Sequence, residues 1–228
     1  MTTLFDYLLW RGDLPLEADP LNEVDGVILA RLSYMPFERI LERESTQPIT
    51  VEETARRLLA LPDIETAVRR RGDTDLLRAL AESPRFGRMA LSAYADRLDA
   101  ESQTQFSAIT VAQEPEHTAV IYRGTDNTLI GWKEDFNMGF VCPVPGQLLA
   151  VDYLQRAAER FSGRLTVCGH SKGGNFAVYA AAFCGETVQR RIGTVYNFDG
   201  PGFDSTVLTQ EGYRRVCDRI QTYVPQSS

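Results

Sequence analysis

The stretch that most constrains how this chain can fold is residues 165–182, LTVCGHSKGGNFAVYAAA. Its centre, Gly169-His170-Ser171-Lys172-Gly173, is a Gly-x-Ser-x-Gly motif between an apolar run and a run of small, helix-forming residues. Such a context predicts a strand, a sharp turn and a helix, with the serine at the turn. The flanking glycines remove Cβ atoms where the backbone must pass closely. We therefore predict a strained serine whose hydroxyl faces a cleft at the end of a strand.

The two halves of the chain have different residue patterns. Residues 1–85 read as helical, with apolar side chains on one face of 22–41 and shorter helical patterns at 50–62 and 72–84. Thr50 and Glu53 match a capping box. From residue 86 the pattern turns to strands, with an antiparallel pair at 87–99 and 104–113 followed by strands that alternate with helices. We predict an α/β protein with a mostly parallel sheet flanked by helices, in which 1–85 is a cap or buttress and 86–228 the core.

A second informative stretch is residues 120–136, VIYRGTDNTLIGWKEDF. An apolar strand delivers Arg123-Gly124-Thr125 into a loop at the carboxyl edge of the sheet, where open parallel sheets place their sites. Thr125 can offer both its N–H and its hydroxyl to an oxyanion, or it can simply cap the turn. After the serine, the amide N–H of Lys172 points at the same position, so its side chain is read as incidental.

These motifs together resemble known proteins. The strand with Arg-Gly-Thr, then Trp132 and Asp135, then Gly-His-Ser-x-Gly-Gly is similar to the class 3 (fungal-type) triacylglycerol lipases over about 118–203. FDYLLWRGDLPL, NEVDGVILARLSYMPFE and NFDGPGF resemble a bacterial family of uncharacterised α/β-hydrolase-like proteins related to those lipases, over nearly the whole chain. The resemblance implies an α/β-hydrolase-like fold, Ser171 as the nucleophile and Thr125 as an oxyanion donor.

The sequence offers more than one candidate for the acid of such a site. Asp199 ends an apolar strand pattern 28 positions after Ser171 (199 − 171), a location that respects the chain order serine, acid, histidine. Class 3 lipases usually carry their aspartate one strand later, before Val-Pro, but no carboxylate adjoins Val224-Pro225. Either Asp199 has taken the role or the acid lies beyond residue 228. Asp199 as a plain turn residue is the alternative, and Asp204 is a weaker candidate.

The general base is missing from the predicted site. The chain has two histidines, His117 and His170. His170 adjoins the serine, so its ring should project to the opposite side and pack. His117 begins a strand, and seven residues at ~3.3 Å each place it roughly 20 Å from the edge that holds the serine. Because the chain stops just after a strand pattern, we expect it to be truncated, with the histidine further on.

Two classes of function follow from these residues. The first is a serine hydrolase that acts on a carboxylic ester or thioester, with a lipid-like acyl group suggested by the family analogy alone. The second is a catalytically inactive binding module with the same fold, in which the serine is vestigial. A base supplied by another chain is a third possibility for the mechanism.

Composition excludes several other partners. The net charge of −7 gives no basic surplus for a nucleic acid, and the one basic run, Arg69-Arg70-Arg71, reads as the solvated end of a helix. The four cysteines lack metal-ligand spacing, so we expect reduced, mostly buried thiols and neither metal nor cofactor. No apolar run approaches the ~20 residues of a membrane span, and no signal peptide pattern opens the chain. These features predict a cytoplasmic protein whose oligomeric state the sequence leaves open.

Overall fold

The computed structural model describes residues 3–114 and 116–226, and within them seven strands form one sheet in chain order. The strands are β1 (Ile49–Thr50), β2 (Ala90–Asp99), β3 (Thr104–Glu114), β4 (His117–Tyr122), β5 (Arg164–His170), β6 (Ile192–Phe198) and β7 (Ile220–Tyr223). Neighbours from β1 to β4 pair antiparallel, and neighbours from β4 to β7 pair parallel. The chain is α/β, but its sheet is mixed, so the prediction of a mostly parallel sheet holds only for the half from β4 to β7.

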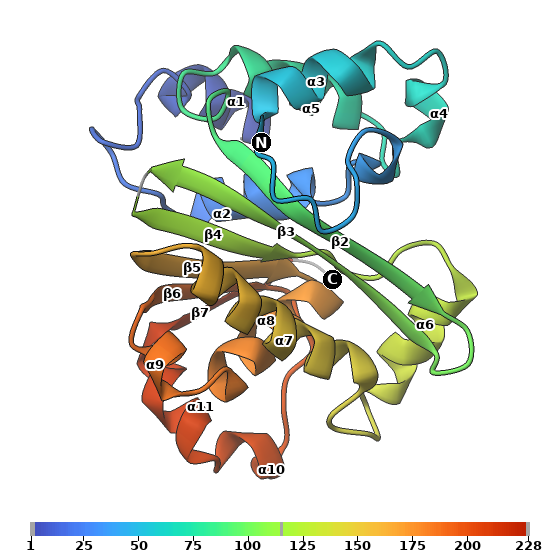
Figure 1. The fold of residues 1–228 in the computed structure, drawn as a ribbon, viewed down its shortest axis with the longest axis vertical. Helices are drawn as coiled ribbons and strands as arrows, with labels where there is room; N and C mark the ends of the chain where they lie inside the picture. The colour runs from blue at the N-terminus through green and yellow to red at the C-terminus, as the bar shows by residue number, and fades with distance from the viewer. Residues whose placement is uncertain (1–2, 115, 227–228) are drawn as a thin grey trace.

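The strand order explains why one face of the sheet carries all the crossover helices. From β4 to β7 each new strand is added on the same side of the previous one, and right-handed crossovers then place every connecting helix on one face. These helices are α7 (Pro145–Arg160), α8 (Lys172–Phe183) and α11 (Glu211–Val216). They bury Leu154, Phe176 and Val216 against Val167 and other side chains of the sheet (Figure 1).

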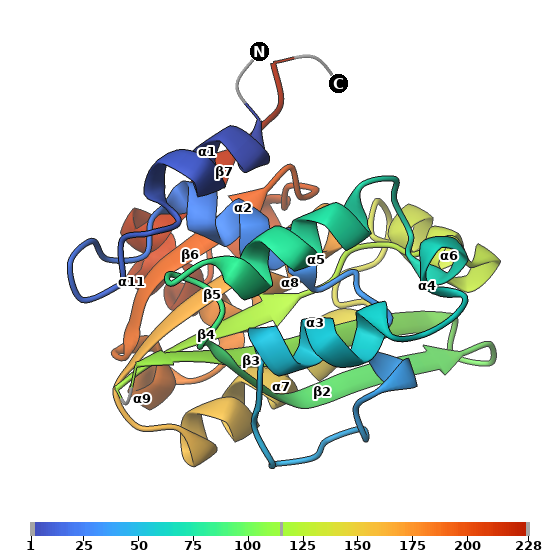
Figure 2. The same ribbon diagram turned by 90° about the horizontal axis from the view of Figure 1, so that it is seen from above.

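The opposite face of the sheet is covered by the N-terminal helices. These are α1 (Leu4–Arg11), α2 (Glu23–Leu32), α3 (Val51–Leu59) and α5 (Asp73–Glu82), which cross the sheet in the view of Figure 2. Leu58 and Leu77 lie in one apolar core with Leu91, Ile121 and Cys168 of the strands. The molecule is therefore a three-layer structure in which residues from both halves of the sequence share a core.

Local structure agrees with the predicted elements in most places. The helical patterns at 22–41, 50–62 and 72–84 form α2, α3 and α5, although α2 ends at Leu32. Thr50 accepts from the Glu53 N–H, but the Glu53 carboxylate binds Arg56 and Arg57, so the expected capping box forms in one direction only. The remaining elements are short: α4 (Ile64–Ala67), α6 (Leu129–Asn137), α9 (Glu186–Gln189), α10 (Ser205–Leu208) and the 3-10 turns η1 (Phe37–Arg39) and η2 (Cys217–Arg219).

Among the helices that the structure describes, none is both long and apolar enough to cross a bilayer. The cytoplasmic location of the protein stays a prediction.

Candidate functional site

Ser171 lies at the turn between β5 and α8 in a backbone conformation that side-chain-bearing residues rarely adopt. Its φ is 57° and its ψ is −132°, a region that costs of order 1–3 kcal/mol for a residue other than glycine. Its N–H donates to the carbonyl of Phe198 at the end of β6, at 2.8 Å. The geometry is the strained strand-to-helix turn predicted from the motif. The role of Ser171 as a nucleophile stays a prediction.

Two glycines allow the backbone to close around this serine. A Cβ on Gly173 would lie 2.2 Å from the carbonyl oxygen of Tyr122, at the end of β4. A Cβ on Gly124 would lie 2.3 Å from the Tyr34 hydroxyl and 3.2 Å from the Ser171 Cβ. The Arg123-Gly124-Thr125 loop is therefore packed directly against the serine, as the Gly-Thr pattern predicted.

The Thr125 hydroxyl is buried beside this turn. Within the described part of the chain, its Oγ1 has no hydrogen-bond partner. It does not cap the following helix, because Thr128 does so by accepting from the Gly131 N–H at 3.1 Å. The turn-capping alternative for Thr125 is therefore wrong, and among the described residues its buried hydroxyl is left without a partner.

Tyr34 joins the loop to the turn, a role that the sequence alone did not indicate. Its hydroxyl accepts from the Gly124 N–H at 3.1 Å and lies 3.0 Å from Nδ1 of His170. Because the hydroxyl oxygen already accepts once, its own hydrogen can be donated to an unprotonated Nδ1. The segment after α2 thereby fixes the loop and the residue before Ser171 at the same time.

The Lys172 side chain is not incidental, contrary to the interpretation from sequence. Its Nζ lies 2.8 Å from the Glu134 carboxylate of α6 and donates to the Gln105 carbonyl of β3, with both charged side chains buried. Glu134 also accepts from the N–H groups of Gln105 and Gly146. Burial lowers the pKa of Lys172, and the Glu134 carboxylate opposes that change. This ion pair fastens the start of α8 to α6 and to the amino end of α7.

Asn175, one turn further along α8, ties the elbow to neighbouring loops. Its Nδ2 donates to the Pro201 carbonyl at 2.9 Å, and its Oδ1 accepts from Gln147 at 2.8 Å. Both of its side-chain polar atoms are used in the fold, so Asn175 is a structural residue.

Asp199 follows β6 on the strand next to Ser171. Its φ is 56°, its N–H donates to the Tyr223 carbonyl at 2.8 Å, and the residue is exposed. The DGPG turn is held instead by Asn197, which accepts from the Gly200 N–H at 3.0 Å. Asp204, the weaker candidate, caps α10 by accepting from the Thr206 N–H at 2.9 Å. The Asp199 carboxylate is therefore exposed at the carboxyl edge of the sheet, while Asp204 has a structural role.

The two histidines are used by the fold. His117 pairs in register with Arg164 at the start of β5, and its Nε2 lies 2.9 Å from Thr166 Oγ1. Ser171 follows the other end of that strand. His170 is half-buried and packs against Tyr34, and burial lowers its pKa, as do the guanidiniums of Arg70 and Arg31, while the Asp199 carboxylate opposes them. The packed state expected for His170 is observed.

Across residues 3–114 and 116–226, no group of three or more histidine, cysteine or acidic side chains could hold a metal ion. Two cysteines, Cys168 and Cys184, are buried, and Cys142 and Cys217 are exposed, so the expectation of mostly buried thiols holds for half of them.

The fold and the site define an α/β protein with a serine at a strained turn after a parallel strand, faced by a Gly-Thr loop. A family model described as Mbeg1-like matches residues 80–228, and the chain belongs to that family, which is related to the class 3 lipases. No curated protein matches the chain. The match begins in the last turn of α5, so it covers the elbow and its facing loop but leaves out α1 to α4 and most of α5.

Proposed function

We propose that this chain carries the nucleophile and oxyanion donors of an α/β-hydrolase-like serine esterase that acts on a carboxylic ester or thioester. The observation that carries the proposal is the strained Ser171 packed against Gly124, with an unpartnered Thr125 hydroxyl in the same loop. A folded protein retains such strain where the surrounding structure enforces it, and function is the common reason.

In the proposed reaction, Ser171 Oγ attacks the acyl carbonyl and a histidine that these 228 residues do not supply accepts its proton. The tetrahedral oxyanion is stabilised by the N–H of Lys172 and by the N–H and hydroxyl of Thr125. As the first residue of α8, Lys172 has no acceptor for its N–H within that helix. Collapse expels the alcohol or thiol, which takes the proton from the histidine, and water then releases the acid.

Asp199 is the proposed acid that orients this histidine. It lies at the carboxyl end of β6, directly after Phe198, whose carbonyl accepts from the Ser171 N–H. Its exposed carboxylate leaves it able to pair with an imidazole that approaches from outside the described residues.

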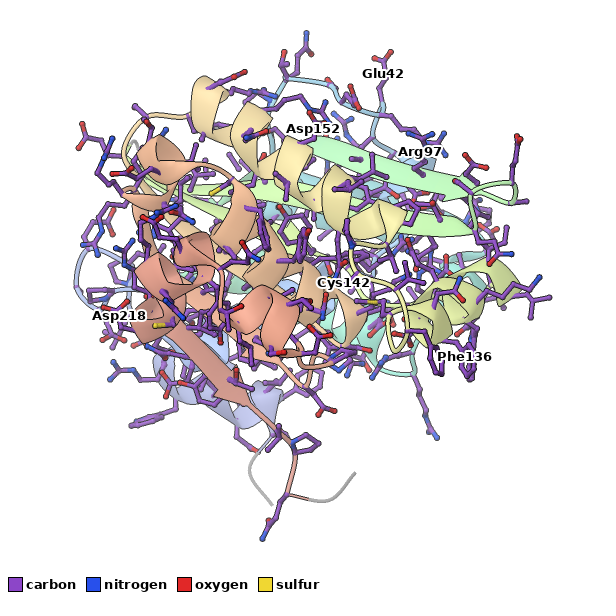
Figure 3. All side chains as sticks on the ribbon, turned by 90° about the horizontal axis from the view of Figure 1, so that it is seen from below. Glu42, Arg97, Phe136, Cys142, Asp152 and Asp218 are labelled. Atoms are coloured by element: carbon purple, nitrogen blue, oxygen red, sulfur yellow. The ribbon has the colours of Figure 1, made fainter. Side chains whose placement is uncertain are left out.

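The lipid-like character of the substrate is supported by α6. Leu129, Trp132 and Phe136 share one face of this helix and are 72%, 66% and 70% exposed. Figure 3 shows Phe136 projecting from α6 at the edge of the molecule. The buried side chain of the same helix is the charged Glu134. An exposed apolar face next to the Thr125 loop suits an apolar acyl chain.

The N-terminal region is proposed to act as a buttress. Tyr34 holds the Gly124 amide and His170 from that side of the sheet, and the helices share a core with β4 and β5. A cap that moved as a unit would have to break these contacts.

The decisive experiment is labelling of the 228-residue chain by a fluorophosphonate with and without imidazole as an external base. Loss of a triad base costs on the order of 10⁴–10⁶ in turnover, so we expect slow labelling alone. Imidazole should accelerate labelling about tenfold or more, at Ser171, with no acceleration in Ser171→Ala. Ser205→Ala, which removes an exposed serine of α10, is the matched control and should behave as the parent chain.

The second candidate function is a binding module with an inactive serine. It is favoured by the two histidines, both of which are used elsewhere in the fold. If imidazole fails to promote labelling of a correctly folded chain, the esterase proposal is wrong and the binding module replaces it. Rapid labelling without imidazole would contradict the external base.

A further inference from the structure

A small cavity lies beside the elbow, on the face that the N-terminal helices cover. Its volume is about 170 Å³, with Val27, Ala30 and Phe198 among its apolar walls and Arg31, Arg70 and His170 among its polar ones. Two of these residues also adjoin the turn at Ser171. His170 precedes Ser171 in the chain, and the Phe198 carbonyl accepts from the Ser171 N–H. Ser171 itself does not line the cavity, so a group bound there would contact the residue before the serine and not its hydroxyl.

The charge around this cavity is positive in a chain whose net charge is −7. Arg31 is paired with the buried Asp73 carboxylate at 2.7 Å. The Arg70 guanidinium lies 5.5 Å from the Tyr34 ring centroid, and among the described residues it has no carboxylate within ion-pair distance. Its effect on the pKa of His170 exceeds that of Asp199. One uncompensated cation thus adjoins an apolar cavity.

Hydrogen bonds hold the backbone of Arg70 in place beside the cavity. The basic run at 69–71 does not close a helix, contrary to the sequence interpretation, but forms a bend between α4 and α5. Within it, the Arg70 N–H donates to Asp73 Oδ2 at 2.9 Å, and the Arg31 guanidinium binds the same carboxylate through its other oxygen. Asp73 therefore links α2 to the bend and keeps Arg70 at the cavity.

We infer that this cavity receives a short aliphatic chain that ends in a carboxylate or phosphate, and that Arg70 recognises the anion. This inference goes beyond the function proposed above, since the cavity is lined by His170 and not by Ser171. An apolar cavity of about 150 Å³ holds benzene in another protein, so the volume here suits about six carbons. A guanidinium binds carboxylate or phosphate through strong, charge-assisted hydrogen bonds.

The test is calorimetric titration of the 228-residue chain, and of its Ser171→Ala variant, with hexanoate, hexyl phosphate, hexanol and inorganic phosphate. Both alkyl anions should bind about tenfold more tightly than hexanol, because a hydrogen bond to a charged group is worth that much in affinity. They should exceed inorganic phosphate by a similar factor, because phosphate leaves the apolar walls empty. The tighter of the two alkyl anions identifies the natural terminal group.

Three variants separate the site from general electrostatics. Arg70→Gln should weaken hexanoate or hexyl phosphate about tenfold and leave hexanol unchanged. Arg71→Gln removes the same charge one residue away, outside the cavity lining, and should change the affinity less than about twofold. Val27→Phe should fill the cavity and weaken both alkyl anions, with native stability verified by thermal unfolding.

Equal binding of hexanol and hexyl phosphate, or equal losses in Arg70→Gln and Arg71→Gln, would overturn the inference. So would tight binding of inorganic phosphate alone. The outcome is independent of the esterase proposal: alkyl anions that bind a chain whose Ser171 does not react would contradict the proposed function only. A reactive Ser171 with no binding of these probes would contradict the cavity assignment only.

Discussion

Ser171 combines an unfavourable backbone conformation with contacts that hold it in place. Phe198 accepts its N–H, its own carbonyl accepts from Gly174 at 2.8 Å, and Gly124 packs against its side chain. These contacts come from three segments, so the turn cannot relax locally. The free energy stored at this residue is recovered only if the residue itself changes.

We therefore predict that Ser171→Gly stabilises the protein. Glycine adopts the observed φ and ψ without strain, which recovers of order 1–3 kcal/mol, and its greater freedom in the unfolded chain costs roughly 0.5–1 kcal/mol. The expected net gain is about 1 kcal/mol in the free energy of unfolding, measured by urea titration. Ser171→Ala keeps the Cβ and should match the parent chain. A glycine variant less stable than the alanine variant would contradict this.

Residues that contact the site from distant parts of the chain could not be predicted from the sequence. Ser171 and Thr125 sit in short motifs whose local geometry is dictated by neighbouring glycines, and their placement beside each other follows from β4 and β5 being adjacent. Tyr34, Glu134 and Arg70 reach the site from other segments. The residues around each of them in the sequence do not indicate which partner it contacts, because the partner is set by how the helical layers pack on the sheet.

At the scale of elements, periodicity decided what could be predicted. The hairpin β2–β3 and the amphipathic helix α3 have clear periods and were found. The strand β1 has two residues, too few to alternate, and α6 reverses the usual pattern by burying a glutamate and exposing aromatic rings. The parallel half of the sheet followed from alternating strands and helices. The strands from β1 to β4 pair antiparallel, so the sheet as a whole is mixed.

The buried ion pair between α6 and α8 gives a prediction at this scale. Lys172→Met leaves the Glu134 carboxylate buried without its cation, so we expect a loss of about 3–5 kcal/mol in the free energy of unfolding. Adding Glu134→Gln removes the uncompensated charge and should recover part of that loss, as measured by urea unfolding of both variants. Lys133→Met, at the exposed neighbouring lysine, should change stability by no more than about 0.5 kcal/mol.

Recovery in the double variant is the informative outcome. If Lys172→Met and the double variant lose the same stability, the cost comes from packing of the lysine and not from an unpaired charge. That result would contradict the proposed electrostatic link between α6 and the first residue of α8.

At the scale of the molecule, the sheet needs a layer on each face. The unidirectional strand order puts α7, α8 and α11 on one face, so the other is left to the N-terminal helices. The family match from residue 80 covers the sheet from β2 onward but excludes that second layer. The residues before 80 are therefore part of the structural unit, even though they lie outside the match.

We predict that both halves of the chain unfold as one cooperative unit, and Leu77→Ala tests it. Leu77, in α5, is fully buried in the core shared with Leu91 and Ile121, so its truncation should cost about 2–5 kcal/mol. If the layers are coupled, hydrogen exchange of backbone amides should accelerate by the same factor in α5 and in β5. The reason is that the amides of both segments then exchange through one global unfolding event. Leu98→Ala, at an exposed leucine of β2, should leave both segments unchanged. Faster exchange confined to residues before 85 would instead mean that the N-terminal helices open on their own. They would then be a separable cap, and the hold of Tyr34 on the Gly124 loop would be too weak to keep the site in place.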